Sequence, residues 1–159
     1  MKIFISQPMK GYSNFEIEII RGKIKEALKE KYGNDIEIID SFIKGAPANA
    51  KPLWYLGESL KRLSTADIAV FAYNTPEFGD KIALARDCDR EEKCAREYDT
   101  LCLYVAFYKN SFKSDVNIEL SKLSTQRPDF VEWWNELHRS LGKTKWEEGQ
   151  AAGCDASLI

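Results

Sequence analysis

The stretch RDCDREEKCAREY, residues 86–98, lies between two apolar runs, Ile68–Tyr73 and Leu101–Phe107. Apolar runs of this length are typical of buried strands, and the charged stretch between them is long enough for a helix. A strand, a helix and a second strand in this order predict a β-α-β unit with parallel strands. Ligands of such units gather where the strands end and the helices begin. The residues around position 86 are therefore expected to border a crevice.

Glu91 lies in the first turns of this expected helix. A carboxylate there can face the crevice from a rigid element, and the positive end of the helix dipole favours its ionised form. Such a group is a candidate nucleophile for a sugar carbon. An ordinary glutamate near the start of a surface helix would give the same pattern, and spacing alone leaves both interpretations open.

Strand and helix signals also alternate earlier in the chain. Lys2–Ile5 is expected to be a strand, and Ser13 followed by Glu16 has the spacing of a capping box before a stripe of apolar residues at helical period. Ile36–Ile39 is expected to be a second strand, and Pro52 fits the first position of a second helix. This alternation predicts an α/β fold: a Rossmann-like, doubly wound parallel sheet of four to five strands, with helices on both faces.

The pattern changes after the last apolar run, which places an α/β domain at residues 1–108. Asp115–Leu123 is expected to be a short helix and Pro128–Leu141 a longer one. Residues 109–143 would thus form a helical extension that packs on the domain or on a neighbouring subunit. Residues 144–159 are small and polar and are expected to be a flexible tail.

Composition places the chain among ordinary globular proteins. It has 159 residues, 44% of them hydrophobic and 30% charged, which suits one domain with a single core. A net charge of −2 gives no basic field for a nucleic acid polymer, so a small molecule is the expected partner. No apolar run approaches a membrane span, and the N-terminus reads as a strand rather than a signal peptide. No membrane partner and a cytoplasmic location are therefore expected.

The cysteines and the histidine do not form a metal-binding pattern. Cys88 and Cys94 are six residues apart, with no CxxC motif and no nearby histidine. His138, the only histidine, lies on an expected amphipathic helix near Trp133 and Trp134, and is expected to be a packing or surface residue rather than a catalyst. Neither a metal nor another cofactor is expected.

Other polar residues are expected near the crevice. Gln7 and Pro8 follow the first strand and either line a sugar pocket or merely shape the turn. Asp40, after the second strand, either bonds a sugar hydroxyl or caps its loop. Arg86 is a candidate phosphate ligand, because guanidinium groups match phosphate oxygens. Its alternative role is surface salt bridging with the acidic residues around it.

Several segments together resemble the nucleoside 2-deoxyribosyltransferase-like family, especially its short bacterial and phage branch. The resemblance covers residues 1–108, about two-thirds of the chain. Its motifs are specific only in combination. They are Lys2–Gly11, Ile39–Pro47, Lys51–Gly57, Ser64–Asp67, and Cys88, Glu91, Cys94, Ala95, Glu97 and Tyr98.

The resemblance implies a catalytic role for Glu91. In the family, a glutamate four residues before a small helix residue attacks C1′ of the deoxyribose, and Glu91 with Ala95 matches that spacing. The implied reaction is a retaining double displacement through a glycosyl-enzyme ester. Asn117 matches, loosely, an asparagine that reaches the sugar in a neighbouring subunit. The family builds its sites at subunit contacts, so a homo-oligomer is also implied.

The chain departs from the family pattern at two places. Ser59 falls near a position where these enzymes commonly have an aspartate, and Ala85–Cys88 replaces their usual residues before the nucleophile. These positions handle the leaving base and its protonation in the family. The departures leave base specificity and turnover open.

Three functions remain open from the sequence. The first is an enzyme that transfers or hydrolyses the deoxyribosyl group of a 2′-deoxynucleoside or its 5′-monophosphate. The second is a protein that binds a nucleotide or nucleotide signal in the same pocket without chemistry, as a phage protein that sequesters a host signal would. The third, weaker alternative is an interaction module built on the helix with Trp133 and Trp134.

Overall fold

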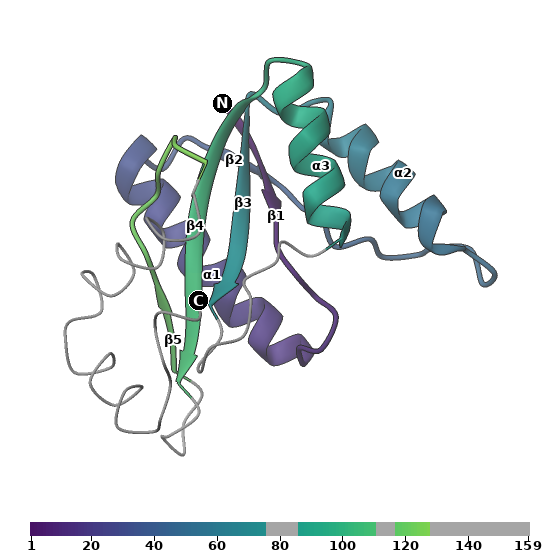
Figure 1. Ribbon diagram of the computed structural model, residues 1–159, viewed down its shortest axis with the longest axis horizontal. Helices are drawn as coiled ribbons and strands as arrows, with labels where there is room; N and C mark the ends of the chain where they lie inside the picture. The colour runs from purple at the N-terminus through teal and green to yellow at the C-terminus, as the bar shows by residue number, and fades with distance from the viewer. Residues whose placement is uncertain (76–85, 111–116, 128–159) are drawn as a thin grey trace, which may run out of the picture.

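The computed structural model describes residues 1–75, 86–110 and 117–127, which form a five-stranded sheet with helices on both faces (Figure 1). The strand order is β2-β1-β3-β4-β5, and all neighbouring strands are parallel except β4 and β5. This arrangement confirms the predicted α/β, Rossmann-like fold. The strands are β1 (Lys2–Ser6), β2 (Glu37–Ile39), β3 (Ile68–Thr75), β4 (Leu101–Asn110) and β5 (Asn117–Leu120).

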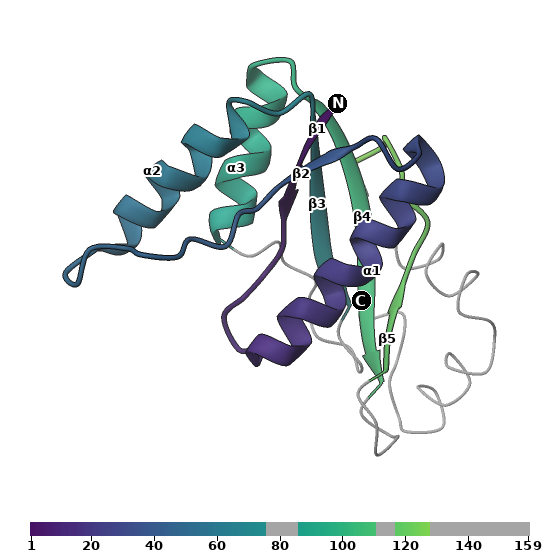
Figure 2. The same cartoon turned by 180° about the vertical axis from the view of Figure 1, so that it is seen from behind.

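The three described helices cover opposite faces of the sheet. Helix α1 (Asn14–Tyr32) covers one face, while α2 (Pro52–Leu63) and α3 (Arg86–Glu97) lie together on the other, as the two opposite views show (Figures 1 and 2). Residues along β1, β3 and β4 alternate between two apolar clusters. Ile3 and Ile5 pack beneath α1, and Phe4 packs in the cluster beneath α3. Both faces are thus buried, as expected for a doubly wound sheet.

Local signals explain where α1 and α2 begin and end. Ser13 and Glu16 form the predicted capping box, in which each side chain accepts a hydrogen bond from the other residue's backbone amide. Gly33 follows the end of α1 with a φ of 89°, a conformation that costs glycine little. Pro52 opens α2, where its missing amide proton is not needed.

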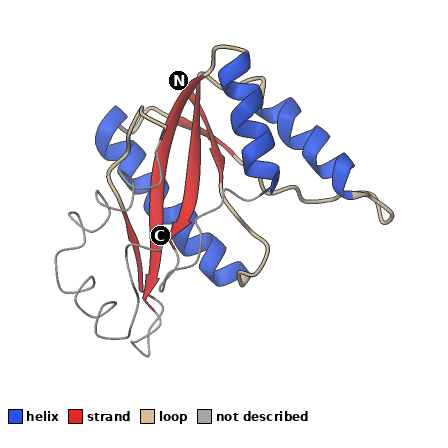
Figure 3. Ribbon diagram, in the orientation of Figure 1, coloured by secondary structure: helices blue, strands red, loops and turns tan. Residues whose placement is uncertain are grey.

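Residues 117–120 form a strand rather than part of a helix. This strand, β5, pairs antiparallel with β4, and Ile118 is 1% exposed in the sheet core (Figure 3). The prediction of a helix at Asp115–Leu123 is therefore wrong. Ile118 and Leu120 alternate with polar residues at the period of a strand, and pairing with β4 decides between the two periods. The sheet consequently continues past residue 108, since β4 ends at Asn110.

The predictions for residues 128–159, including the helix Pro128–Leu141 and the tail 144–159, lie outside the described residues. Within the described ranges, no helix is both long and apolar enough to cross a membrane.

Candidate functional site

A cavity of about 590 Å³ opens beyond the carboxyl end of β1, where ligands of parallel sheets bind. Four segments line it: the loop after β1, the loop after β2, the middle of α2 and the start of α3. The first two segments contribute Ser6, Gln7, Pro8, Met9, Lys10, Ser41, Phe42 and Ile43, and the helices contribute Tyr55, Leu56, Ser59, Arg86, Asp87, Cys88 and Glu91.

Glu91 lies at this cavity with both carboxylate oxygens held by hydroxyl groups. Its side chain comes from α3 and the residue is only 6% exposed. Ser6 Oγ at the end of β1 donates a hydrogen bond of 2.5 Å to Oε2, and Ser59 Oγ on α2 donates one to Oε1. Three separate elements therefore fix one carboxylate, which is the degree of orientation that a nucleophile requires.

Burial raises the pKa of Glu91 above that of an ordinary glutamate, and the nearby charge of Asp87 adds to this effect. The hydrogen bonds from Ser59 and Ser6 act in the opposite direction, because they stabilise the ionised form. The carboxyl group can therefore exchange its proton closer to neutral pH than a surface glutamate can. A group of this kind can attack an electrophilic carbon when ionised or hold a proton when neutral.

Cys88 also lines the cavity, but its thiol is unreactive at neutral pH. Burial is the main cause that raises the pKa of this thiol to about 12; the charges of Glu91 and Asp87 act in the same direction, and a hydrogen bond with Ser6 opposes them. The thiolate is the reactive form of cysteine, so Cys88 is not a nucleophile at neutral pH.

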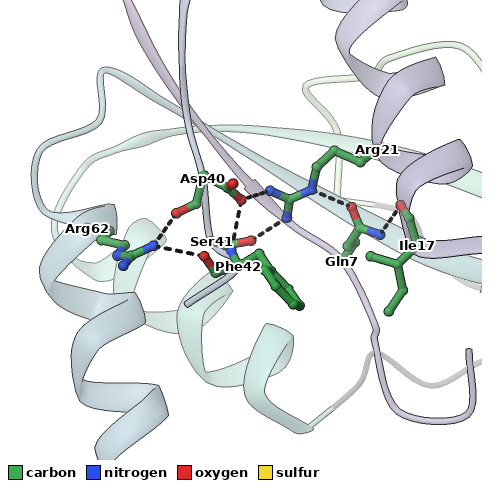
Figure 4. Close-up of polar contacts among 7 residues, drawn as sticks. All are labelled: Gln7, Ile17, Arg21, Asp40, Ser41, Phe42 and Arg62. Carbon is green, nitrogen blue, oxygen red and sulfur yellow. Dashed lines mark hydrogen bonds and ion pairs between the residues drawn. The ribbon is translucent and has the colours of Figure 1, made fainter. Parts of the chain in front are cut away.

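Gln7 borders the cavity, yet its amide group faces α1 (Figure 4). Its Nε2 donates to the carbonyl oxygen of Ile17 at 3.1 Å, and its Oε1 accepts from Arg21 Nε at 3.2 Å. Both ends of the amide are thus bonded to α1. Pro8, also expected at the sugar, lines the cavity beside it.

Asp40 lies beside the cavity rather than in its lining. Its carboxylate pairs with Arg21 and accepts a hydrogen bond of 2.9 Å from the backbone amide of Phe42. Its backbone carbonyl accepts one of 2.6 Å from Arg62 on α2. These contacts correspond to the loop-capping role considered for Asp40.

Arg86 and Asn117 lie in different parts of the fold, at the start of α3 and at the start of β5. Arg86 is at the mouth of the cavity, with its side chain 69% exposed and 3.5 Å from the carboxylate of Asp87. Salt bridging is thus present, and Lys10 is a second cation in the lining. Asn117 begins β5, and β3 and β4 separate that strand from β1. Its expected role concerns a neighbouring subunit and stays a prediction.

Three polar side chains of this region were not predicted from the sequence: Ser6, Ser41 and Arg21. Ser6 immediately precedes Gln7 at the end of a strand, so the crevice argument applied to it equally well. Arg21 lies on the apolar stripe of α1, four residues after Ile17 and three before Ile24, and that position is the local signal that could have marked it as a buried charge. Among the described residues, no cluster of side chains suited to a metal ion is present.

Comparison with models of known protein families finds no match for this chain, and no curated protein matches it either.

Proposed function

We propose that this protein acts on the N-glycosidic bond of a 2′-deoxynucleoside or its 5′-monophosphate, with Glu91 as the nucleophile. The observation that carries the proposal is the buried Glu91 carboxylate, oriented by Ser6 and Ser59 at the wall of a cavity large enough for a nucleoside. The resemblance of residues 1–108 to the nucleoside 2-deoxyribosyltransferase-like family supports the same assignment.

In the proposed reaction, an ionised Glu91 oxygen attacks C1′ as the C1′–N bond breaks. The base leaves with the bonding electron pair and takes a proton from water, and a deoxyribosyl ester of Glu91 remains. A second base, or water after loss of a proton, then attacks C1′ and releases Glu91 as a carboxylate. Two inversions give net retention at C1′. The absence of a 2′-oxygen makes the oxocarbenium-like transition state more accessible, so one carboxylate can suffice.

The surroundings of Glu91 offer places for the other parts of such a substrate. Phe42 and Tyr55, each about two-fifths exposed at 41% and 40%, supply aromatic surface for a base. Lys10 and Arg86 supply positive charge for a 5′-phosphate at the mouth of the cavity. We include in the proposal a cytoplasmic location and a homo-oligomer in which Asn117 reaches a neighbouring site.

The direct test is chromatographic detection of free base. Purified protein is incubated with 2′-deoxynucleosides and their 5′-monophosphates, with and without a second free base. The proposal predicts base release or exchange that the Glu91→Gln variant loses by at least about 10³-fold. The matched control is Glu97→Gln, which changes an exposed glutamate on the same helix and retains the activity. Base release that is unchanged in Glu91→Gln would exclude Glu91 as the nucleophile.

A second candidate is a nucleotide-binding protein without catalysis. One observation favours it: Ser59 puts a hydroxyl beside Glu91 near a position where the resembling enzymes have an acid, and both oxygens of Glu91 already accept hydrogen bonds. This candidate predicts that a nucleotide binds and is recovered unchanged after prolonged incubation. Calorimetry followed by chromatography of the same sample separates the two functions.

A further inference from the structure

Arg21 is a buried arginine that joins two loops of the cavity (Figure 4). Its residue is 7% exposed, and its guanidinium group bonds partners on both loops. Nε donates to Gln7 in the loop after β1, whereas Nη1 and Nη2 donate to Asp40 and to Ser41 Oγ in the loop after β2, the last at 2.6 Å. Each of the three guanidinium nitrogens therefore has a partner.

The direction of the bond to Ser41 fixes what its hydroxyl can do. Arginine only donates hydrogen bonds, so Ser41 Oγ must be the acceptor. The hydroxyl hydrogen of Ser41 then points away from Arg21, and Ser41 lines the cavity. Ser41 thus offers a donor to a bound ligand. Ser6 and Ser59 differ, since their hydrogens are directed to Glu91 and only their lone pairs face other groups.

The same loop carries the apolar wall of the cavity. Phe42 and Ile43 follow Ser41 directly and both line the space. Arg62 on α2 donates to the carbonyl oxygens of Asp40 and Phe42, so arginines from two helices hold the loop in place. A donor beside an aromatic and an aliphatic side chain suits the edge of a flat ring whose faces are apolar.

We propose that the Ser41 hydroxyl donates a hydrogen bond to an acceptor on the edge of the base. Arg21 is the positioning residue: by donating to Ser41 Oγ, it leaves the hydroxyl hydrogen free to point at the ligand. This inference rests on the proposed function, because it names the part of a nucleoside that the loop after β2 recognises. The acceptor is a ring nitrogen or a carbonyl oxygen of the base.

The test measures equilibrium binding of 2′-deoxynucleosides in the Glu91→Gln background, where no ligand is consumed. The best-bound nucleoside is compared with analogues that each lack one acceptor, such as deaza purines or thiocarbonyl pyrimidines. One analogue is expected to bind about five- to tenfold more weakly, as for loss of one hydrogen bond. Ser41→Ala should weaken the parent nucleoside by the same factor and leave that analogue unchanged.

Two further variants distinguish recognition from folding. Ser41→Thr keeps the hydroxyl and should restore the discrimination between parent and analogue. Arg21→Lys keeps the charge opposite Asp40 but not the planar fork, so it should lose discrimination as Ser41→Ala does. Ser64→Ala, which removes an exposed hydroxyl bonded to Lys61 on α2, is the matched control and should change neither affinity.

The outcomes separate this inference from the proposed function. If Ser41→Ala and the parent protein discriminate equally between the nucleoside and the analogue that lacks the acceptor, the role of Ser41 is overturned. The proposed chemistry is unaffected by that result. If the discrimination between nucleoside and analogue depends on Ser41 but the protein with Glu91 intact releases no base, the inference is supported and the proposed chemistry is rejected. Failure of every deoxynucleoside and monophosphate to bind rejects both.

Discussion

Glu91 and Glu92 are consecutive residues of α3, and both are buried, yet their carboxylates have different surroundings. Glu91 lies at the cavity between two serine hydroxyls. Glu92 is 0% exposed, accepts a hydrogen bond from the Tyr104 hydroxyl at 2.8 Å and pairs with Arg96 and Arg127. One carboxylate is therefore neutralised by structural cations, while the other is held only by neutral groups beside the cavity.

The burial of Glu91 should make folding stability depend on pH. Its pKa is raised in the folded protein, so the folded chain binds more protons than the unfolded chain between the two pKa values. The stability associated with Glu91 is full below its unfolded pKa and is lost as pH rises through its folded pKa. Glu91→Gln never ionises, so it should unfold at a higher temperature than the parent at pH 7.5, and the difference should shrink toward pH 4. Thermal unfolding at both pH values measures this, and a lower unfolding temperature at pH 7.5 contradicts it.

Ser59→Ala should move the pH dependence of base release. The Ser59 hydrogen bond lowers the pKa of Glu91, so its removal raises that pKa and leaves less nucleophile ionised at acidic pH. We expect kcat/KM to fall about tenfold or more below the midpoint of the profile and to recover as pH rises. A pH–rate profile measured beside the Ser64→Ala control checks this. A loss of the same size at every pH would point instead to a misplaced Glu91.

Tyr104→Phe should destabilise the fold without changing the cavity. The variant removes the Tyr104 donor to Glu92, whose Oε2 already has no hydrogen-bond partner among the described residues. We expect a loss of about 1–2 kcal/mol in the free energy of unfolding. Urea titration measures it, with Tyr98→Phe as the control, because Tyr98 is 79% exposed on the surface. Equal midpoints for the two variants would show that the hydrogen bond contributes nothing.

Cys88 should resist alkylation in the native protein. At pH 8 a thiol with a pKa of about 12 is ionised in about one molecule in 10,000, and this thiol is also buried. Partly exposed Cys94 on the same helix provides the internal comparison. Mass spectrometry after brief iodoacetamide treatment should find Cys94 modified and Cys88 intact, with both modified after guanidinium denaturation. Rapid native modification of Cys88 would contradict its burial.

Local signals were sufficient to predict most of the fold. The Ser13 capping box, Pro52 and the apolar runs each act within a few residues, and each element begins or ends close to where these signals place it. β5 was not predicted as a strand, because its four residues include too few apolar positions to distinguish the period of a strand from that of a helix. Its structure is decided by hydrogen bonds to β4, which no local pattern reveals.

The candidate site was harder to predict because its contacts join distant residues. The position of Glu91 near a crevice followed from the order of strands and helices. Its two hydroxyl partners could not, since Ser6 is 85 residues away and Ser59 is 32 residues away in sequence. The orientation of Gln7 likewise depends on Arg21, whose place on the apolar stripe of α1 indicates burial but does not reveal its partners.

The order of the strands also bears on how copies of this protein can meet. β2 and β5 form the two sides of the sheet and, with three and four residues, are its shortest strands. Each leaves only a few backbone groups for pairing with a strand from another molecule, while the long strand β3 is enclosed between β1 and β4. Short outer strands are one way in which proteins avoid edge-to-edge aggregation and fibre growth. Within the part of the sheet that the structure describes, the short outer strands thus leave little edge for another copy to join.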